Sequence, residues 1–217
     1  MSSAPTLVLA SASPARLSTL RSAGLAPYVL VSGVDEAAAL LHYPDLAADE
    51  VALVLAKAKA EAVAAVLDAD GAPDDAPDDA LVLGCDSVLE LDGEVHGKPV
   101  DADEAIARWR RMRGRSGVLH TGHWVVDLRE DSSSATLGAV ASTTVHFADV
   151  TDDEIAAYVA TGEPLAVAGA FTTDGLGGAF VRGIEGDHHT VVGVSLPLLR
   201  DLMGECGVPW PSLWARA

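Results

Sequence analysis

An apolar segment at residues 7–10 is followed at once by two serines, a proline and an arginine. Ser13 is suited to cap the N-terminus of a helix, and Pro14 is suited to its first position, where a missing N–H costs nothing. Unpaired amides, the positive end of the helix dipole, and the side chains of Ser11 and Arg16 would then converge on one small volume. This arrangement predicts an anion site, for which phosphate is the commonest occupant. An ordinary strand-to-helix turn with a serine cap is the structural alternative.

A carboxylate inside a strongly apolar segment is the second feature with chemical potential. Asp86 follows Leu-Val-Leu-Gly-Cys and precedes Ser-Val-Leu. Burying a charged carboxylate is costly unless it is paired with a cation or binds a metal. A functional role is therefore favoured, although Gly84 would also allow a polar residue at a bulge or at the end of a strand.

A lysine on the apolar side of a predicted helix is the third. Helical periodicity over residues 49–67 places Lys59 in the middle of an apolar stripe. Lys57 lies on the opposite face, with Glu61 one turn away as a surface partner. Lys59 is therefore expected to point toward the core or toward a cleft at its edge. The alternative is that its stem follows the core while the ammonium reaches solvent.

Two shorter segments carry charge beside turns. Lys98 lies within Gly-Lys-Pro directly after a predicted hairpin, and lysines beside turns are usually at the surface. Asp35 and Glu36 follow a predicted strand at 28–32 and offer oxygen ligands to a hard divalent cation. A short acidic pair in a loop is more often simply exposed.

The composition indicates a globular protein and excludes several kinds of partner. The 217 residues are 49% hydrophobic and carry a net charge of −18, with only 14 lysines and arginines. Such a chain repels nucleic-acid polymers and anionic membranes. No apolar segment approaches the roughly 20 residues that span a bilayer, and no signal peptide is recognised, so a cytoplasmic location is expected.

The two cysteines and seven histidines show no metal-ligand spacing. The cysteines lie far apart and are expected to be reduced. His120 and His123 are three apart in a predicted strand and would point to opposite faces. His188 and His189 are adjacent in a predicted loop. The sequence therefore predicts no structural zinc site.

The elements that must position these residues alternate between the strand and helix periods. We expect strands over 7–10, 28–32, 81–90, 94–96, 119–128, 137–148, 168–172, 178–184 and 191–194. We expect helices over 14–23, 49–67, 102–112, 152–161 and 196–205. Hairpins mixed with crossover helices predict one α/β domain over residues 1–217. Its mixed central sheet would be flanked by helices around a central cleft.

Taken together and in this order, these segments resemble the Maf family of nucleotide pyrophosphatases, once described as septum-formation inhibitors. The resemblance runs from about residue 7 to about residue 205. The segments that carry it are Leu9-Ala-Ser-Ala-Ser-Pro-Ala-Arg16, Val34-Asp-Glu36, Leu55-Ala-Lys-Ala-Lys-Ala60, Gly84-Cys-Asp-Ser87, Gly97-Lys-Pro99, His120-Thr-Gly122, Tyr158-Val-Ala-Thr-Gly-Glu-Pro164, Ala168-Gly-Ala-Phe171, Gly175-Leu-Gly-Gly178 and Val192-Gly-Val-Ser-Leu-Pro197.

The resemblance implies a Maf/ITPase-like fold that hydrolyses a nucleoside triphosphate to the monophosphate and pyrophosphate. It also implies a divalent cation, Mg²⁺ or Mn²⁺, and a homodimer, which many members form. The family's proton acceptor matches Asp86. The predicted site comprises catalytic Asp86, Lys59 and Lys98, substrate-binding Ser11, Ser13, Arg16 and Glu36, and metal-binding Glu36 and Asp86.

Three positions depart from the family pattern and bear on the choice of base. Many members have an arginine or a tryptophan where this chain has Ala15. Thymidine- and uridine-type members have threonine at Ser87 and glutamine at Asp174. An ionised Asp174 accepts hydrogen bonds but donates none, so it would favour a base edge that presents N–H groups. A preference for thymidine or uridine is therefore not expected.

Two other classes of function compete with hydrolysis. Ala15 and Asp174 fit a nucleotide-binding regulatory module with little turnover, linked to cell division. The presence of Arg16, Lys59, Asp86 and Lys98 argues against it, because binding alone needs no base. A pyridine-nucleotide oxidoreductase is disfavoured because the glycine-rich segment 175–178 matches no dinucleotide fingerprint.

Overall fold

A seven-stranded mixed sheet runs through the computed structural model, which describes residues 5–69, 72–129 and 135–215. The strand order is β2-β1-β3-β5-β6-β7, and β4 pairs with β3 on the edge that β1 also uses. β1 is parallel to both β2 and β3, and the other pairs are antiparallel. The strands are β1 (Thr6–Leu9), β2 (Tyr28–Val29), β3 (Ala80–Leu91), β4 (Glu94–His96), β5 (Ser116–Asp127), β6 (Thr136–Phe147) and β7 (Val181–Glu185).

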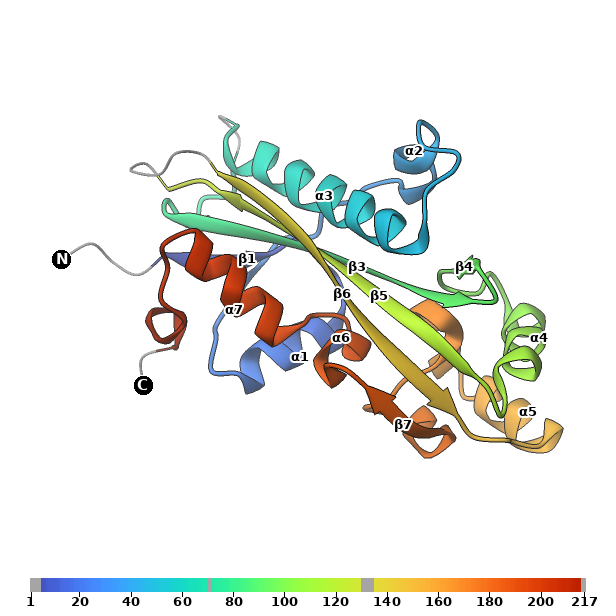
Figure 1. Cartoon of the computed structure of the whole chain (residues 1–217). Coiled ribbons are helices and arrows are strands. Elements are labelled where there is room, and N and C mark those ends of the chain that lie inside the picture. The colour runs from blue at the N-terminus through green and yellow to red at the C-terminus, as the bar shows by residue number, and fades with distance from the viewer. Residues whose placement is uncertain (1–4, 70–71, 130–134, 216–217) are drawn as a thin grey trace.

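Helices cover both faces of this sheet. They are α1 (Pro14–Ser22), α2 (Glu36–Leu40), α3 (Ala48–Leu67), α4 (Ala102–Met112), α5 (Asp152–Ala160), α6 (His188–Val192) and α7 (Leu196–Glu205), with short 3₁₀ segments η1 (Glu163–Ala166), η2 (Ala168–Ala170), η3 (Leu176–Phe180) and η4 (Trp210–Leu213). Figure 1 shows α3 on one face of the sheet and α1 with α7 on the other, while α4 and α5 lie at the far end.

The alternation of side chains along β1 explains this layering. Leu7 and Leu9 belong to the core beneath α1 and α7, whereas Val8 packs with Val63 of α3. Successive strand residues point to opposite faces, so a continuous apolar strand is covered on both sides. The strand is consequently buried at the centre of a three-layer structure.

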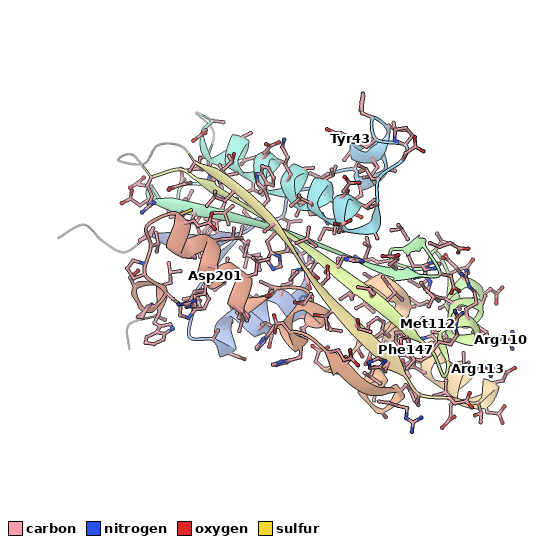
Figure 2. The ribbon with its side chains drawn as sticks, in the orientation of Figure 1. Tyr43, Arg110, Met112, Arg113, Phe147 and Asp201 are labelled. Atoms are coloured by element: carbon pink, nitrogen blue, oxygen red, sulfur yellow. The ribbon has the colours of Figure 1, made fainter. Side chains whose placement is uncertain are left out.

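The far end of the molecule has a separate aromatic core around Trp109 of α4. The Trp109 ring lies edge-on to Phe147 and Tyr158, with centroid distances of 5.8 and 5.5 Å. Figure 2 places Phe147 inside this end and Arg110 and Arg113 near its outer surface. Both arginines pair with one α5 carboxylate, that of Asp152. This core packs α4 and α5 against the C-terminal halves of β3 and β6 and the N-terminal half of β5.

The five predicted helices and the first six predicted strands are confirmed with small shifts at their ends, except that the strand expected over 28–32 covers only Tyr28–Val29. The strands expected over 168–172 and 191–194 are wrong, and 178–184 holds a strand only from Val181. Gly169 has φ of +72°, which breaks an extended segment into a 3₁₀ turn. Residues 188–192 form α6, so the two adjacent histidines lie in a helix and not in a loop.

Local signals near turns are also confirmed. Asp92 and Gly93 both have positive φ, as the two-residue hairpin between β3 and β4 requires. The sequence pairs Thr151 with Glu154 and Asp101 with Glu104 each have the spacing of a capping box. Thr151 and Glu154 form one at the start of α5, and Asp101 caps α4. The single domain expected over residues 1–217 stays a prediction. The continuous seven-stranded sheet is consistent with it. The polar connection 129–134 lies mostly outside the described residues.

Helix α3 approaches the backbone of the sheet more closely than side chains would allow. A Cβ added to Gly84 would collide with the carbonyl of Ala56 and lie 2.8 Å from the amide of Ala60. A Cβ on Gly122, which lies opposite Asp86 on β5, would collide with the carbonyl of Ala52. These two glycines therefore set the depth at which α3 places its inward-facing side chains.

We expect Gly84→Ala to destabilise the fold by about 1–3 kcal/mol or more, because the new methyl group meets helix backbone. Gly204→Ala is the matched control, since its Cβ meets nothing within 4 Å inside α7. That substitution should stabilise the protein slightly by improving helix propensity. Urea unfolding of both variants measures the difference, and equal stabilities would contradict the close approach of α3.

Candidate functional site

One edge of β3 lacks a strand partner over its central residues. Among the described strands, β1 pairs with Ala80–Leu83 and β4 pairs with Leu89–Leu91, whereas β5 pairs continuously along the opposite edge. The interval between them contains Asp86 and Ser87. The loop that leads into α1 also begins here, because the amide of Ala10 donates to the carbonyl of Leu83. Side chains from distant segments can therefore approach β3 along this unpaired stretch of its edge.

Asp86, Lys59 and Glu36 form the first cluster at this edge. The Lys59 ammonium lies 2.5 Å from Asp86 Oδ1 and 2.6 Å from Glu36 Oε1. Asp86 is only 7% exposed, while the Glu36 side chain is half exposed. The prediction that Lys59 points inward is confirmed, and Lys57 pairs with Glu61 at the surface as expected. One cation thus bridges a buried and an exposed carboxylate.

Burial gives Asp86 the character of a base. Removal from water raises the pKa of its carboxyl group, and the charges of Lys59 and Arg16 oppose that rise. A carboxylate with a raised pKa is a stronger proton acceptor than an exposed one. Its neighbour Cys85 is buried in the core with a thiol pKa raised to about 12, so it stays a neutral structural residue.

Arg16, Ser11 and Ser87 form the second cluster. The two terminal nitrogens of Arg16 donate to the hydroxyl oxygens of Ser11 and Ser87, each at 3.1 Å. Ser13 caps α1, since its hydroxyl accepts the amide of Arg16 at 3.4 Å, and Pro14 takes the first helical position. The predicted convergence of helix start, hydroxyl groups and arginine is confirmed. Ser87 follows Asp86 on β3, so the two side chains point to opposite faces of the sheet, Asp86 toward α3 and Ser87 toward α1. The two clusters therefore lie on either side of the open edge of β3, close enough for the charge of Arg16 to act on the pKa of Asp86.

The structure does not join every predicted residue to these clusters. Among the described residues, no hydrogen bond or ion pair connects Lys98 or Asp174 with Asp86, and both side chains are exposed. Lys98 follows β4, which lies on the Asp86 edge of β3. Its backbone is held because the Gly97 carbonyl accepts from Arg108 at 2.6 Å. Ala15 lies in the first turn of α1, beside Arg16.

The arginines in and directly after α4 already pair with acidic groups. The arginine-rich segment around α4 makes ion pairs that link Arg108 with Glu104, Arg110 and Arg113 with Asp152, Arg111 with Glu94, and Arg115 with Asp92. These pairs hold α4 to α5 and to the β3–β4 hairpin. The cations of the described residues that serve the Asp86 edge are therefore chiefly Arg16 and Lys59.

Glu163 is a structural residue that sequence analysis missed. Its carboxylate accepts the amides of Leu176 and Gly177, both at 3.0 Å, and the hydroxyl of Tyr158. A Cβ on Gly177 would collide with that hydroxyl. The glycine-rich segment before β7 is thus packed against protein and has two amides already bonded. Its glycines were the available signal, but nothing in the sequence identified their partner.

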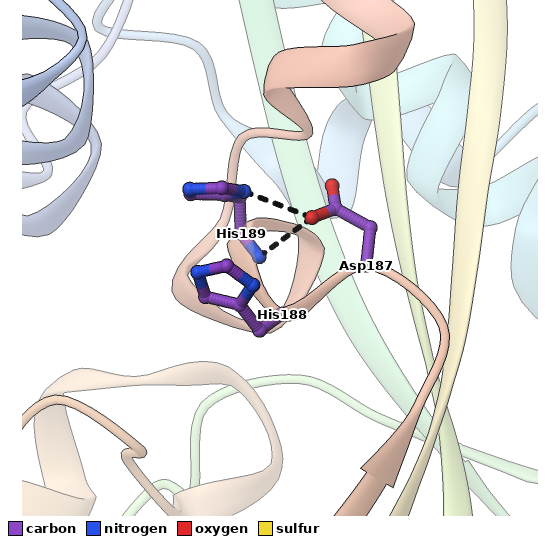
Figure 3. Close-up of side chains that lie close together, drawn as sticks. All are labelled: Asp187, His188 and His189. Atoms are coloured by element: carbon purple, nitrogen blue, oxygen red, sulfur yellow. Dashed lines mark hydrogen bonds and ion pairs between the residues drawn. The ribbon is translucent and has the colours of Figure 1, made fainter.

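A second group of potential metal ligands lies away from Asp86. Asp187, His188 and His189 bring one ligand atom each within 4.8 Å of one another (Figure 3). The Asp187 carboxylate already caps α6, where it accepts from the amide and Nδ1 of His189 and from Thr190 Oγ1. Its oxygens are therefore already engaged in hydrogen bonds at the start of α6, and the expectation of no structural zinc site stays a prediction.

A pocket of about 680 Å³ lies at the opposite end of α1. It is lined mainly by apolar groups, which include Gly24, Leu196, Pro197, Trp210 and Trp214. None of the predicted site residues lines it. The candidate site is therefore the polar edge of β3 and not this apolar hollow.

Comparison with known proteins shows the family of this chain. Residues 6–206 match the sequence model of a family described as "Maf-like protein". The chain belongs to the Maf-like protein family. Its relatives within that family align along nearly the whole chain.

A Maf-like relative from Salinispora tropica is 61% identical over 97% of this chain and 88% of its own length. Relatives from Streptomyces coelicolor and Mycobacterium marinum are 57% and 50% identical, and the alignments cover 97% and 96% of this chain and 95% and 96% of theirs. All three are named "Nucleoside triphosphate pyrophosphatase". Among the described helices of this Maf-like chain, none is both long and apolar enough to cross a membrane.

A buried histidine behind the site predicts how stability depends on pH. His123 Nδ1 donates to the carbonyl of Thr121 and Nε2 accepts the amide of Ser195 at 2.8 Å, so the ring is held neutral. Burial lowers its pKa to about 4. The unfolded chain therefore binds more protons between pH 6.5 and pH 4, and folding loses stability as the pH falls through that range.

We expect this loss to reach about 3 kcal/mol for His123. Urea unfolding at several pH values measures it, and His123→Gln should show a smaller loss over the same range. His123 ring signals that titrate near the ordinary pKa of 6.5 would contradict the prediction.

Proposed function

We propose that this chain hydrolyses a nucleoside triphosphate to the nucleoside monophosphate and pyrophosphate at the edge of β3. The observation that carries the proposal is the contact between Asp86 and Lys59, a buried carboxylate and an ammonium only 2.5 Å apart. The relatives from Salinispora tropica and Streptomyces coelicolor carry the name of this reaction. Binding alone would not require a buried base, whereas hydrolysis does.

Asp86 is the proposed general base. A water beside its carboxylate attacks the α-phosphorus, and Asp86 accepts the proton that the water loses. The new bond joins the water oxygen to the α-phosphorus, and the bond from that phosphorus to the bridging oxygen of the β-phosphate breaks. The electron pair of the broken bond leaves with pyrophosphate. Lys59 orients the Asp86 carboxylate and offsets negative charge on the phosphates.

The phosphates are proposed to bind to groups that already converge on this edge. Arg16 and Ser11 supply hydrogen-bond donors, and the amides at the start of α1 face the same volume. Ser13 contributes by capping that helix. Lys98 is proposed to reach the phosphates from beyond β4, since its exposed side chain is free to move toward a bound anion. Such binding is mainly positioning and charge stabilisation.

Glu36 and Asp86 are the residues proposed to hold a divalent cation. Their carboxylates approach a single ammonium to within 2.6 Å, so their oxygens already converge on one positive charge. Oxygen ligands of this kind suit Mg²⁺ or Mn²⁺. When bound, the cation would neutralise charge on the phosphate oxygens. Lys59 would share its two carboxylate partners with it.

Ala15 and Asp174 are proposed to act in the selection of the base. A small Ala15 leaves space beside Arg16, and an exposed Asp174 offers only acceptors when ionised. A base whose edge presents N–H groups would then be preferred, including a modified or non-canonical base. The whole chain is proposed to act as one domain in the cytoplasm, and a homodimer is the proposed assembly.

The test is pyrophosphate release from a panel of nucleoside triphosphates with Mg²⁺ or Mn²⁺ added. Many turnovers per chain, with monophosphate and pyrophosphate in equal amounts, are expected for at least one nucleotide. Tight nucleotide binding with less than one turnover per chain would contradict the proposal and favour a regulatory binding module. Comparison with metal removed by a chelator should show that turnover stops.

A further inference from the structure

The hydroxyl of Ser87 has a second partner on the neighbouring strand. Thr121 of β5 lies directly opposite Ser87 of β3, and their hydroxyl oxygens are 2.8 Å apart. Thr121 is fully buried and its hydroxyl donates to the backbone carbonyl of Thr190 in α6, also at 2.8 Å. A carbonyl only accepts, so the direction of that last hydrogen bond is fixed.

The direction of the whole chain of hydrogen bonds follows from this. A hydroxyl has one hydrogen to donate, and that of Thr121 is used on Thr190. The hydrogen between Ser87 and Thr121 must therefore come from Ser87. Ser87 consequently has no hydrogen left for a ligand, and its oxygen accepts from Arg16 at 3.1 Å. The bonds run in one direction from Arg16 to Ser87, Thr121 and the α6 backbone.

A second contact holds Arg16 to the same part of the chain. Arg16 Nε donates to the carbonyl of Gly193, directly after α6, at 2.7 Å. Gly193 has φ of +115°, and a Cβ there would lie 3.0 Å from Arg16 Nε. Within the described residues, the bonds to Gly193, Ser11 and Ser87 use three of the five guanidinium donors. One N–H on each terminal nitrogen is left for phosphate oxygens.

We propose that Thr121 is a positioning residue that fixes the guanidinium of Arg16 through Ser87. The inference rests on the proposed function insofar as Arg16 binds the phosphates. It assigns the Ser87 hydroxyl to the orientation of that arginine and not to recognition of the base. Loss of the hydroxyl at either position should therefore weaken turnover of every nucleotide by a similar factor.

The kinetic test compares Thr121→Val, which keeps the shape and removes the hydroxyl, with Thr121→Ser, which keeps the hydroxyl. Thr121→Val and Ser87→Ala are each expected to lower kcat/KM by about 10- to 100-fold for all nucleotides, because misplacement of a binding group by about 1 Å has such effects. Thr121→Ser should stay within about threefold of the parent. In an Arg16→Ala background, Thr121→Val should change kcat/KM by less than about threefold.

Three kinetic results would overturn the proposal: full activity of Thr121→Val, an unchanged effect of that substitution in the Arg16→Ala background, or a Ser87→Ala variant in which only the base preference changes. Ser87→Ala leaves the buried hydrogen bond between Thr121 and Thr190 intact. It therefore tests the chain of hydrogen bonds from Arg16 to α6 even if Thr121→Val folds poorly.

A readout independent of turnover separates this proposal from the proposed function. The Arg16 Nε–H should give a slowly exchanging ¹⁵N–¹H NMR signal in the parent, identified by its disappearance in Arg16→Lys. That exchange should accelerate in Thr121→Val and Ser87→Ala and stay slow in Thr121→Ser. Unchanged exchange in all variants would refute the positioning role, whether or not the protein hydrolyses nucleotides. Absence of hydrolysis with the expected NMR changes would instead count against the proposed function alone.

Discussion

Asp86→Asn is expected to lower kcat by about 10²–10⁴-fold, the usual contribution of a general base. Asparagine has the size of aspartate and still accepts a hydrogen bond from Lys59, but it does not take a proton from water. Nucleotide binding should change far less, since the cationic groups of Arg16 and Lys59 remain. Steady-state pyrophosphate release and binding of a non-hydrolysable triphosphate analogue measure the two quantities separately.

Asp201→Asn is the matched control for this experiment. Asp201 lies on the exposed face of α7 and pairs with its sequence neighbour Arg200 at 2.7 Å (Figure 2). The same chemical change there should leave kcat unaltered. An Asp86→Asn variant with the parental kcat would show that another group accepts the proton.

Lys59→Met is expected to reduce the free energy of unfolding by about 3–5 kcal/mol, the cost of leaving one member of a buried ion pair alone. The Lys59 side chain is 12% exposed and that of Asp86 is 10% exposed, so little solvent screens the remaining carboxylate. Without Lys59 the pKa of Asp86 should rise further. The loss of stability, relative to the parent, should therefore shrink as the pH falls and Asp86 becomes protonated.

Two comparisons test this explanation by urea unfolding. Lys57→Met removes a lysine two positions away whose pair with Glu61 is about half exposed and 3.8 Å long, and it should cost less than about 0.5 kcal/mol. The double variant Lys59→Met with Asp86→Asn should recover much of the stability lost in Lys59→Met, because no buried charge is left unpaired and the remaining Glu36 carboxylate is half exposed to solvent. A double variant as unstable as the sum of the single changes would contradict a direct interaction.

The fold was predictable wherever a local signal coincides with the final packing. Residues 49–67 show a clear helical period, and Asp92-Gly93 is a strong hairpin turn, so both were predicted correctly. Residues 191–194 are apolar and resembled a strand, but Asp187 caps a helix just before them. There a side chain at a helix N-terminus outweighed the hydrophobicity of the segment. Likewise, a positive φ at Gly169 turned an apparent strand into a 3₁₀ turn.

The centre of the site was predictable for a different reason. Asp86 lies within an apolar strand sequence, and Lys59 lies within the apolar stripe of a helix. Two buried groups of opposite charge are expected to form an ion pair, because an unpaired buried charge is costly. The hydrogen bonds that hold the Arg16 guanidinium gave no such signal. Its partner Gly193 is 177 positions away, and a backbone carbonyl has no sequence signature. Thr121 was likewise visible only as a polar residue within a strand until the register placed it opposite Ser87.

The most direct test of the hydrolytic site is the analysis of products formed in heavy-oxygen water. We predict that the parent protein, with a divalent cation and its preferred triphosphate, releases pyrophosphate without label and a monophosphate that carries one labelled oxygen. This result requires attack by water at the α-phosphorus. Label in the pyrophosphate, or release of single phosphate groups in its place, would contradict the account.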